Sequence, residues 1–300
     1  MNKKLTSQTR PFVLLLLAFV CAGVAHPQTP DFKSGVGPSL MEKAKAGDRD
    51  AEFQVGLAYD TGKDVVQDLA QAASWYQKAA DKGHARAQHN LGVLYEFGEG
   101  VTRDYARAAA LYRQSAEQGF ALSQFSLGLC YAHGDGVSQD YAQALAWYQK
   151  AADQGLPGAM VNLALLYIQG QGVAKDEVKA WNLIHRAAEL GDGSSQLQIA
   201  MDYEDGKHGL APDHALAREW LRKSAEQGYV PAEFDLAMML NDSPREMYYW
   251  LGLVVPHLKG DNLIKTVEVR KKAAAKLLPD EVAQIDSSVD KRLKQQAAQQ

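Results

Sequence analysis

Residues 84–119 read HARAQHNLGVLYEFGEGVTRDYARAAALYRQSAEQG, and residues 120–155 read FALSQFSLGLCYAHGDGVSQDYAQALAWYQKAADQG. Small, aromatic and acidic residues recur at the same places in both stretches, so the chain contains an internal repeat of 36 residues. Three columns of residues continue in register on both sides of this pair. The first holds a small residue, at Ala51, Ala87, Ser123, Ala159, Ser195 and Ala232, and the second holds a glycine or alanine, at Gly56, Gly92, Gly128, Ala164, Ala200 and Ala237. The third holds a tyrosine or leucine, at Tyr59, Tyr95, Tyr131, Tyr167, Tyr203 and Leu240.

Each repeat predicts two helices joined by a glycine turn. In the second unit we expect the first helix at Ala85–Phe97, ended by Gly98 and Gly100, which supply the backbone freedom of a tight turn. The carboxylate of Asp104 then caps the next helix, which runs to Gln118. One such hairpin cannot bury its apolar face alone, so neighbouring hairpins must stack on each other.

The residues of this unit also carry a family resemblance. The motif begins with an alanine, three further residues, Leu-Gly, two further residues and a tyrosine, and continues with Gly98-Glu99-Gly100-Val101 and Asp104-Tyr105. It resembles the motif of the Sel-one-like repeat (SLR) family, whose members are relatives of the tetratricopeptide repeat. The first unit departs from it at Gly62-Lys63-Asp64-Val65, the fifth inserts one residue near Gly206–Gly209, and the sixth is shortened.

The expected fold is all-α: a right-handed α-solenoid of about six helix-turn-helix repeats with C-terminal capping helices. The solenoid is expected at 39–258, with repeats at about 48–83, 84–119, 120–155, 156–191, 192–228 and 229–258. The repeat pattern is lost in 259–300. We expect two capping helices there, at Leu263–Leu278 and Asp280–Gln296, followed by a polar tail.

The N-terminus has the pattern of a Sec-type secretory signal peptide. An uncharged apolar run at Phe12–Ala22 follows the basic residues Lys3, Lys4 and Arg10 and is too short to span a membrane. We expect a signal peptide at 1–25, a flexible leader at 26–38 and a periplasmic or secreted mature protein. Lipidation at Cys21 is disfavoured because no small residue directly precedes it.

Composition and motif content exclude several classes of function. Without the signal peptide the chain has 29 Lys and Arg against 36 Asp and Glu, which argues against nucleic acid as a partner. Cys130, the one cysteine left, is expected to pack as an apolar residue, and Asp202, Glu204 and Asp205 are expected to form an acidic surface group. Every well-defined feature recurs, whereas an active site is a single constellation. We therefore expect no enzyme, cofactor or metal site, and a small-molecule ligand is disfavoured.

A column of short polar residues on the first helix of each repeat is the candidate binding site. Side-chain amides in such a position can hold the backbone of a peptide partner, and the resemblance implies that the first helices line a concave groove. The alternative is that these side chains tie neighbouring helices together. The column consists of Gln54, Asn90, Ser126, Asn162, Gln198 and Asp235.

The C-terminal segment offers a second candidate surface. Between Lys259 and Lys294 nine basic residues accompany six acidic ones, so this end is positive while the repeats are negative. The segment either only caps the solenoid or also docks on anionic polymers through a basic patch at Arg270, Lys271, Lys272 and Lys276.

The resemblance implies a non-enzymatic scaffold or adaptor of the bacterial cell envelope that binds a protein or peptide partner. An alternative comes from the cysteine-rich branch of the family, for which β-lactam or cell-wall-directed activity has been suggested. That branch carries a cysteine pair in each repeat. The present chain does not, since Cys130 is alone after the signal peptide.

Overall fold

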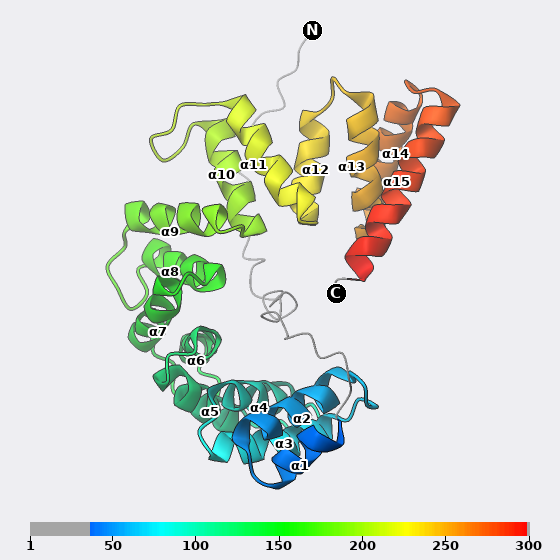
Figure 1. The fold of residues 1–300 in the computed structure, drawn as a ribbon. Helices are drawn as coiled ribbons and strands as arrows, with labels where there is room; N and C mark the ends of the chain where they lie inside the picture. The colour runs from blue at the N-terminus through cyan, green and yellow to red at the C-terminus, as the bar shows by residue number, and fades with distance from the viewer. Residues whose placement is uncertain (1–36, 299–300) are drawn as a thin grey trace. The chain divides into compact units, whose positions relative to one another are not determined.

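A computed structural model of the protein describes residues 37–298 (Figure 1). These residues form α-helices and one 3-10 turn and contain no strand. The first helices of the six hairpins are α2 (Arg49–Thr61), α4 (Ala85–Phe97), α6 (Ala121–His133), α8 (Pro157–Gln169), α10 (Gly193–Asp205) and α12 (Val230–Met239). The second helices are α3 (Leu69–Asp81), α5 (Tyr105–Glu117), α7 (Tyr141–Asp153), α9 (Glu177–Glu189), α11 (His214–Glu226) and α13 (Pro244–Val254).

From α1 to α14 each helix packs on the next one in the chain, which is the arrangement of an α-solenoid and confirms the expected fold class. The expected signal peptide, leader and cleavage site lie outside the described residues, apart from the end of the leader. There, a helix that the sequence did not indicate, α1 (Pro38–Lys45), packs on α2. Its buried Ala44 stands 36 residues before Ala80, so α1 corresponds to the later part of a second helix.

Local chemistry sets the helix ends. Asp104 caps α5 by accepting a hydrogen bond of 3.0 Å from the backbone N–H of Arg107. The second helices α3, α7, α9 and α11 are capped in the same way by Asp68, Asp140, Asp176 and Asp213. Gly98 ends α4 in the left-handed conformation. Both ends agree with the sequence prediction for this repeat.

Glycine is required inside the hairpin by a close contact between its two helices. A methyl group at Gly92 would lie 2.7 Å from Cε1 of Tyr112, whose ring covers the glycine, and Gly56 and Gly128 are covered in the same way by Tyr76 and Tyr148. The fourth and fifth repeats change both partners of this contact. Alanine replaces the glycine at Ala164 and Ala200, and a smaller side chain replaces the tyrosine at Ile184 and Leu221. Size matching at this contact lets the two helices approach.

A buried row of glutamines links the helices on another face. Gln88 of α4 donates a hydrogen bond to the carbonyl oxygen of Ala80 in α3 and accepts one of 2.7 Å from Gln118 at the end of α5. Gln124 and Gln196 repeat this arrangement. In the fourth repeat both positions are apolar, Met160 and Leu190, and in the terminal repeats the column carries Glu52 and Glu233.

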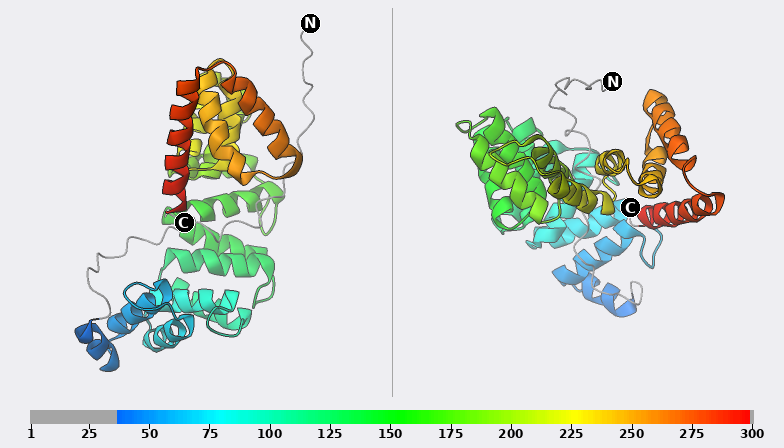
Figure 2. Two further views of the ribbon diagram at one scale, coloured as in Figure 1. Left: turned by 90° about the vertical axis from the view of Figure 1, so that its right-hand side faces the viewer. Right: turned by 90° about the horizontal axis from the view of Figure 1, so that it is seen from above.

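After a 3-10 turn, two helices follow the repeats, α14 (Gly260–Ala274) and α15 (Pro279–Ala297), and both pack on α13 (Figure 2). The expected Leu263–Leu278 helix is thus shifted towards the N-terminus, because the chain leaves the helix after Ala274 and before the proline that opens α15. Ile285 and Val289 of α15 are buried in the cluster that α11, α12 and α13 form. The two helices therefore cover the apolar end of the stack, as expected for capping helices.

Candidate interaction surface

Each first helix presents one stripe of partly or fully exposed residues, at positions four, three and four residues apart, which places them on one helical face. On α12, which ends at Met239, only the first three positions belong to the helix. On α8 the stripe consists of Gly158, Asn162, Leu165 and Gln169. The proposed groove column, Gln54, Asn90, Ser126, Asn162, Gln198 and Asp235, forms the second position of this stripe, and all six residues are partly buried.

Asn90 ties two repeats together. Its Nδ2 donates a hydrogen bond of 3.0 Å to the hydroxyl of Tyr76, and this hydroxyl donates one of 2.8 Å to Asp60 at the end of α2. Burial and the nearby Asp60 raise the pKa of Tyr76 far above its ordinary value, so the phenol stays protonated. At Asn90 the alternative interpretation, a tie between neighbouring helices, therefore applies.

The other members of the column behave differently. Asn162 donates to the carbonyl oxygen of Gly158 in its own helix, at 2.8 Å, and Gln198 donates to Asp202, also in its own helix. Gln54 and Ser126 form no side-chain hydrogen bond with any residue between 37 and 298. The column is thus not a uniform set of links between repeats, and several of its polar groups remain available to a partner.

A second, apolar column runs beside the polar one and was missed by the sequence analysis. It stands three residues later on each first helix and consists of Leu57, Val93, Leu129, Leu165, Met201 and Met238. Its exposure is greatest in the last two repeats, at 36% for Met201 and 41% for Met238. The unbranched methionine side chain adapts to differently shaped partners. The same repeat spacing that revealed the polar column could have revealed this one.

A tyrosine and a carboxylate meet at the C-terminal end of α4. The hydroxyl of Tyr112 donates a hydrogen bond of 2.5 Å to Glu96. Burial raises the pKa of Glu96, and this effect outweighs the hydrogen bond, which acts in the opposite direction. The pair corresponds to Tyr76 and Asp60 in the first repeat, so in both repeats the edge of the stripe carries a phenol held by an acidic residue.

The expectation of an acidic surface group at 202–205 is wrong for Asp202. This side chain is 0% exposed, and it accepts hydrogen bonds from Trp181 and Gln198 and lies 3.1 Å from Nδ1 of His208. Only Glu204 and Asp205 are exposed, and each has a basic partner nearby. Position 202 belongs to a column that is apolar in the preceding repeats, at residues 58, 94, 130 and 166, and this column was the signal of burial.

The basic candidate patch is not one exposed stripe. The guanidinium of Arg270 is 2.6 Å from Asp286 of α15, donates to the carbonyl oxygen of Tyr248 and lies over the ring of that tyrosine, at 4.1 Å from its centre. Arg270 therefore joins α14 to α13 and α15. The exposed members of the patch are Lys271, Lys272 and Lys276.

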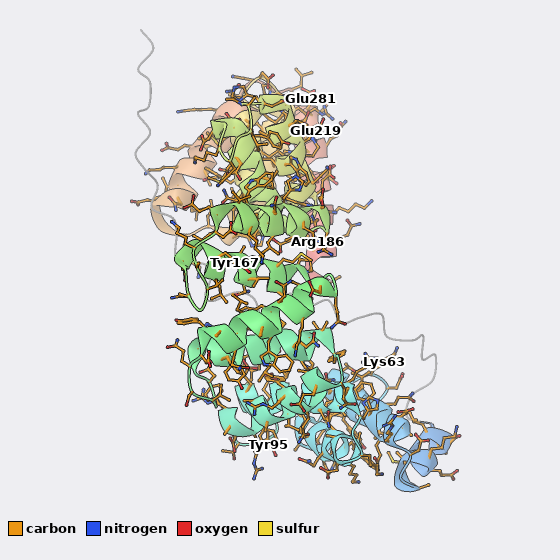
Figure 3. All side chains as sticks on the ribbon, turned by 90° about the vertical axis from the view of Figure 1, so that its left-hand side faces the viewer. Lys63, Tyr95, Tyr167, Arg186, Glu219 and Glu281 are labelled. Carbon is orange, nitrogen blue, oxygen red and sulfur yellow. The ribbon has the colours of Figure 1, made fainter. Side chains whose placement is uncertain are left out.

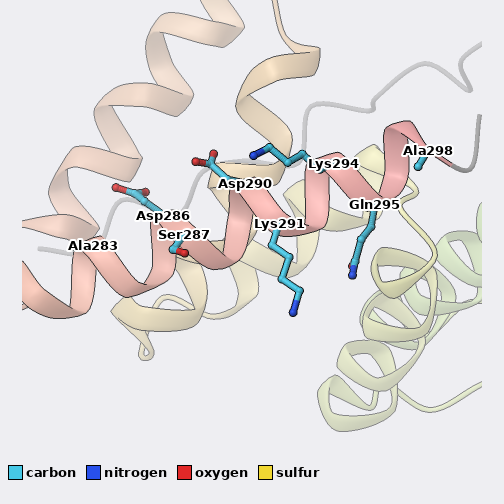
Figure 4. A pocket seen from close by; sticks show the side chains of 8 residues that line it. All are labelled: Ala283, Asp286, Ser287, Asp290, Lys291, Lys294, Gln295 and Ala298. Atoms are coloured by element: carbon cyan, nitrogen blue, oxygen red, sulfur yellow. The ribbon is translucent and has the colours of Figure 1, made fainter.

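The outer face of α15 is polar. Figure 4 shows Asp290, Lys291 and Lys294 projecting from this helix, and all three side chains are exposed. A terminal unit of a solenoid needs such a face, because no further repeat covers it.

Cys130 is buried, as expected, and burial raises the pKa of its thiol to about 12. Within residues 37–298 no group of histidine, cysteine and acidic residues is arranged to hold a metal ion. None of the helices in this part of the chain is both long and apolar enough to cross a membrane.

Comparisons with known proteins identify the repeat. A family model described as Sel1 repeat matches residues 49–84, 85–120, 121–156, 157–192 and 193–229. A Sel1 repeat protein from Oxalobacter formigenes superposes with a TM-score of 0.71 and 30% identity, over 76% of this chain and 67% of that one. A comparison with curated proteins gives no match.

Two further structures are similar at a lower TM-score of 0.44. One is a protective antigen of uropathogenic Escherichia coli displaying an SLR fold, with 32% identity over 79% of this chain and 63% of that one. The other is an immunity protein from Pseudomonas aeruginosa, with 23% identity over 81% and 83% of the two chains.

Proposed function

Because the chain belongs to the Sel1 repeat family, we propose that it is a non-enzymatic scaffold of the bacterial cell envelope that holds a protein or peptide along the stripe of its first helices. Sel1 repeats generally serve as protein-interaction scaffolds. The observation that carries the proposal is the stripe itself, in which a polar and an apolar column run side by side through six hairpins. A surface of this kind offers hydrogen bonds to a peptide backbone and apolar contacts to its side chains.

Site-specific crosslinking in the native envelope tests where the partner binds. A photoreactive residue replaces Ser126 on the stripe and, as a matched control, Gln114, which is exposed on the second helix α5. We expect one partner protein to crosslink at position 126 and none at position 114. Crosslinking at position 114 alone, or at neither position, would contradict the proposed stripe.

The envelope location rests on the basic and apolar pattern of the N-terminus. Cell fractionation and the intact mass of the protein test it: we expect a periplasmic or secreted protein that begins near His26. A cytoplasmic protein that retains its first residues would refute the location and leave the scaffold proposal standing.

The cysteine-rich branch of the family gave an enzymatic alternative. The buried thiol of Cys130, with its raised pKa, does not supply the exposed thiolate that a nucleophile needs. Nitrocefin hydrolysis or labelled-penicillin acylation by the purified protein would overturn the non-enzymatic proposal.

A further inference from the structure

The first helices of the third and fourth repeats differ from all the others in charge. The 13 residues of α6 and the 13 residues of α8 include no Asp, Glu, Lys or Arg, although 23% of the whole chain is charged. Each of the four remaining first helices carries at least two such residues. Second helices also carry charge on exposed positions, for example Arg186 of α9 and Glu219 of α11 (Figure 3).

The uncharged region coincides with the stripe. On α6 the stripe consists of Leu122, Ser126, Leu129 and, at its end, His133, which lies 3.8 Å from Asp135; on α8 it consists of Gly158, Asn162, Leu165 and Gln169. Ser126 has no hydrogen-bond partner among residues 37–298, and Asn162 uses one amide N–H on its own helix. The centre of the stripe thus offers aliphatic surface and a few neutral hydrogen-bonding groups.

A charged group placed on such a surface loses hydration and finds no opposite charge, which is unfavourable. An aliphatic group placed there gains free energy, because its apolar surface is removed from water. The region therefore selects against charged partners more strongly than it selects among apolar ones.

We propose that the partner segment is extended and uncharged where it crosses α6 and α8, with aliphatic side chains on Leu129 and Leu165 and its backbone hydrogen-bonded to Ser126 and Asn162. The inference rests on the proposed function, since it states the chemistry of the segment that the stripe holds. Two first helices about 10 Å wide span roughly 20 Å, which corresponds to about six extended residues.

The flanks of the uncharged region set its limits. On the side of α4 the stripe carries Arg86 and ends beside Glu96, and on the side of α10 it ends at Asp205. Charged residues of the partner are therefore compatible with the flanks and excluded from the centre.

Selection from a displayed library of random 12-residue peptides on the full-length mature protein tests the proposal. We expect enriched peptides to contain a core of about six uncharged residues, with charge confined to their ends. Their affinity should change by less than about threefold between low and high salt, because no ion pair forms at the centre. Enriched peptides with charged cores, or with strongly salt-dependent affinity, would overturn the inference.

Charge placed at position 126 makes the test directional. Ser126→Asp should shift the enriched cores towards Lys and Arg, and Ser126→Lys should shift them towards Asp and Glu. Ser126 forms no side-chain hydrogen bond with any residue between 37 and 298, so neither change removes one. The matched controls Gln114→Asp and Gln114→Lys, on the exposed side of α5, should leave the selection unchanged.

Failure of the inference and failure of the proposed function give different results. If uncharged and charged cores are enriched equally and the position 126 variants alter the selection, the stripe binds peptides without the proposed preference. If no peptide is enriched, or if the position 126 variants change nothing, the stripe is not the binding site and both proposals fall.

Discussion

Glu233 is a buried carboxyl at a position where three other repeats carry glutamine. Gln88, Gln124 and Gln196 each donate a hydrogen bond to a carbonyl oxygen eight residues earlier, in the preceding second helix. For Glu233 that residue is Ala225, and an ionised carboxylate has no N–H or O–H to donate. Glu233 is 1% exposed, and its Oε1 lies 3.5 Å from Nε2 of Gln296 on α15.

Burial raises the pKa of Glu233 from its ordinary value of 4.5 to about 7, against the smaller opposing effects of Gln296 and Arg292. Because the folded state holds the proton more tightly than the unfolded chain, stability is fully present below pH 4.5 and is lost as the pH rises through about 7. Each tenfold change in proton affinity is worth about 1.4 kcal/mol, so the loss approaches about 3 kcal/mol above pH 7.

Glu233→Gln removes the titrating group and restores the amide donor of the other repeats. We expect the variant to exceed the native protein in free energy of unfolding by about 2 to 3 kcal/mol at pH 8 and by clearly less at pH 5. Urea unfolding followed by helical circular dichroism at both pH values measures the difference. Hydrogen exchange should show the added protection in α15, whose Gln296 faces the site.

Glu219→Gln is the matched control, because Glu219 is exposed on α11. It should leave the stability unchanged at both pH values. The reasoning fails if Glu233→Gln has the same effect at pH 5 and pH 8, or if it weakens the protein at pH 8.

Three other predictions concern single contacts of the repeats. The Nδ1 atom of His84 accepts a hydrogen bond from the first turn of α4, and burial lowers the pKa of this imidazole. The free energy of unfolding of the native protein should therefore fall as the pH falls below about 6.5, whereas that of His84→Asn should not. Urea unfolding between pH 7 and 5 measures the difference. Ser195→Ala should raise the free energy of unfolding by about 1 kcal/mol, because the buried hydroxyl has no partner, whereas Ser123→Ala, which loses hydrogen bonds, should lower it. Gly92→Ala should cost about 1 to 3 kcal/mol, and a double-mutant cycle should show that Tyr112→Leu restores part of it.

Sequence reasoning succeeded where the cause of a structure is local. The cap at Asp104 and the helix end at Gly98 depend on a few neighbouring residues, so the pattern of one repeat located both. It failed where the partner is distant in sequence. Nothing near Arg270 indicates that Asp286 and Tyr248 will hold its guanidinium, so an exposed basic patch stood as one of two alternatives for this segment.

The second glycine of the turn between the two helices of a repeat, Gly100 in the second repeat, is required by a contact that only the structure reveals. A methyl group at Gly100 would lie 2.3 Å from the carbonyl carbon of Leu69, in the second helix of the preceding repeat. In the first repeat the position is Asp64, which is exposed and keeps a positive φ of 65°. The position that corresponds to Leu69 in the preceding unit is residue 33, which lies outside the described residues.

The fifth repeat departs from the pattern through two linked changes. The turn gains one residue and carries His208 where the fourth repeat carries Gly172, and Asp202 stands in a column that is otherwise apolar. A fully buried carboxylate is unfavourable unless donors surround it, and the imidazole of His208 lies 3.1 Å from Asp202 while Trp181 donates to the same oxygen. Restoring the ordinary glycine turn alone would remove His208 and leave the carboxylate with fewer partners. The buried carboxylate of Asp202 therefore depends on the turn that carries His208.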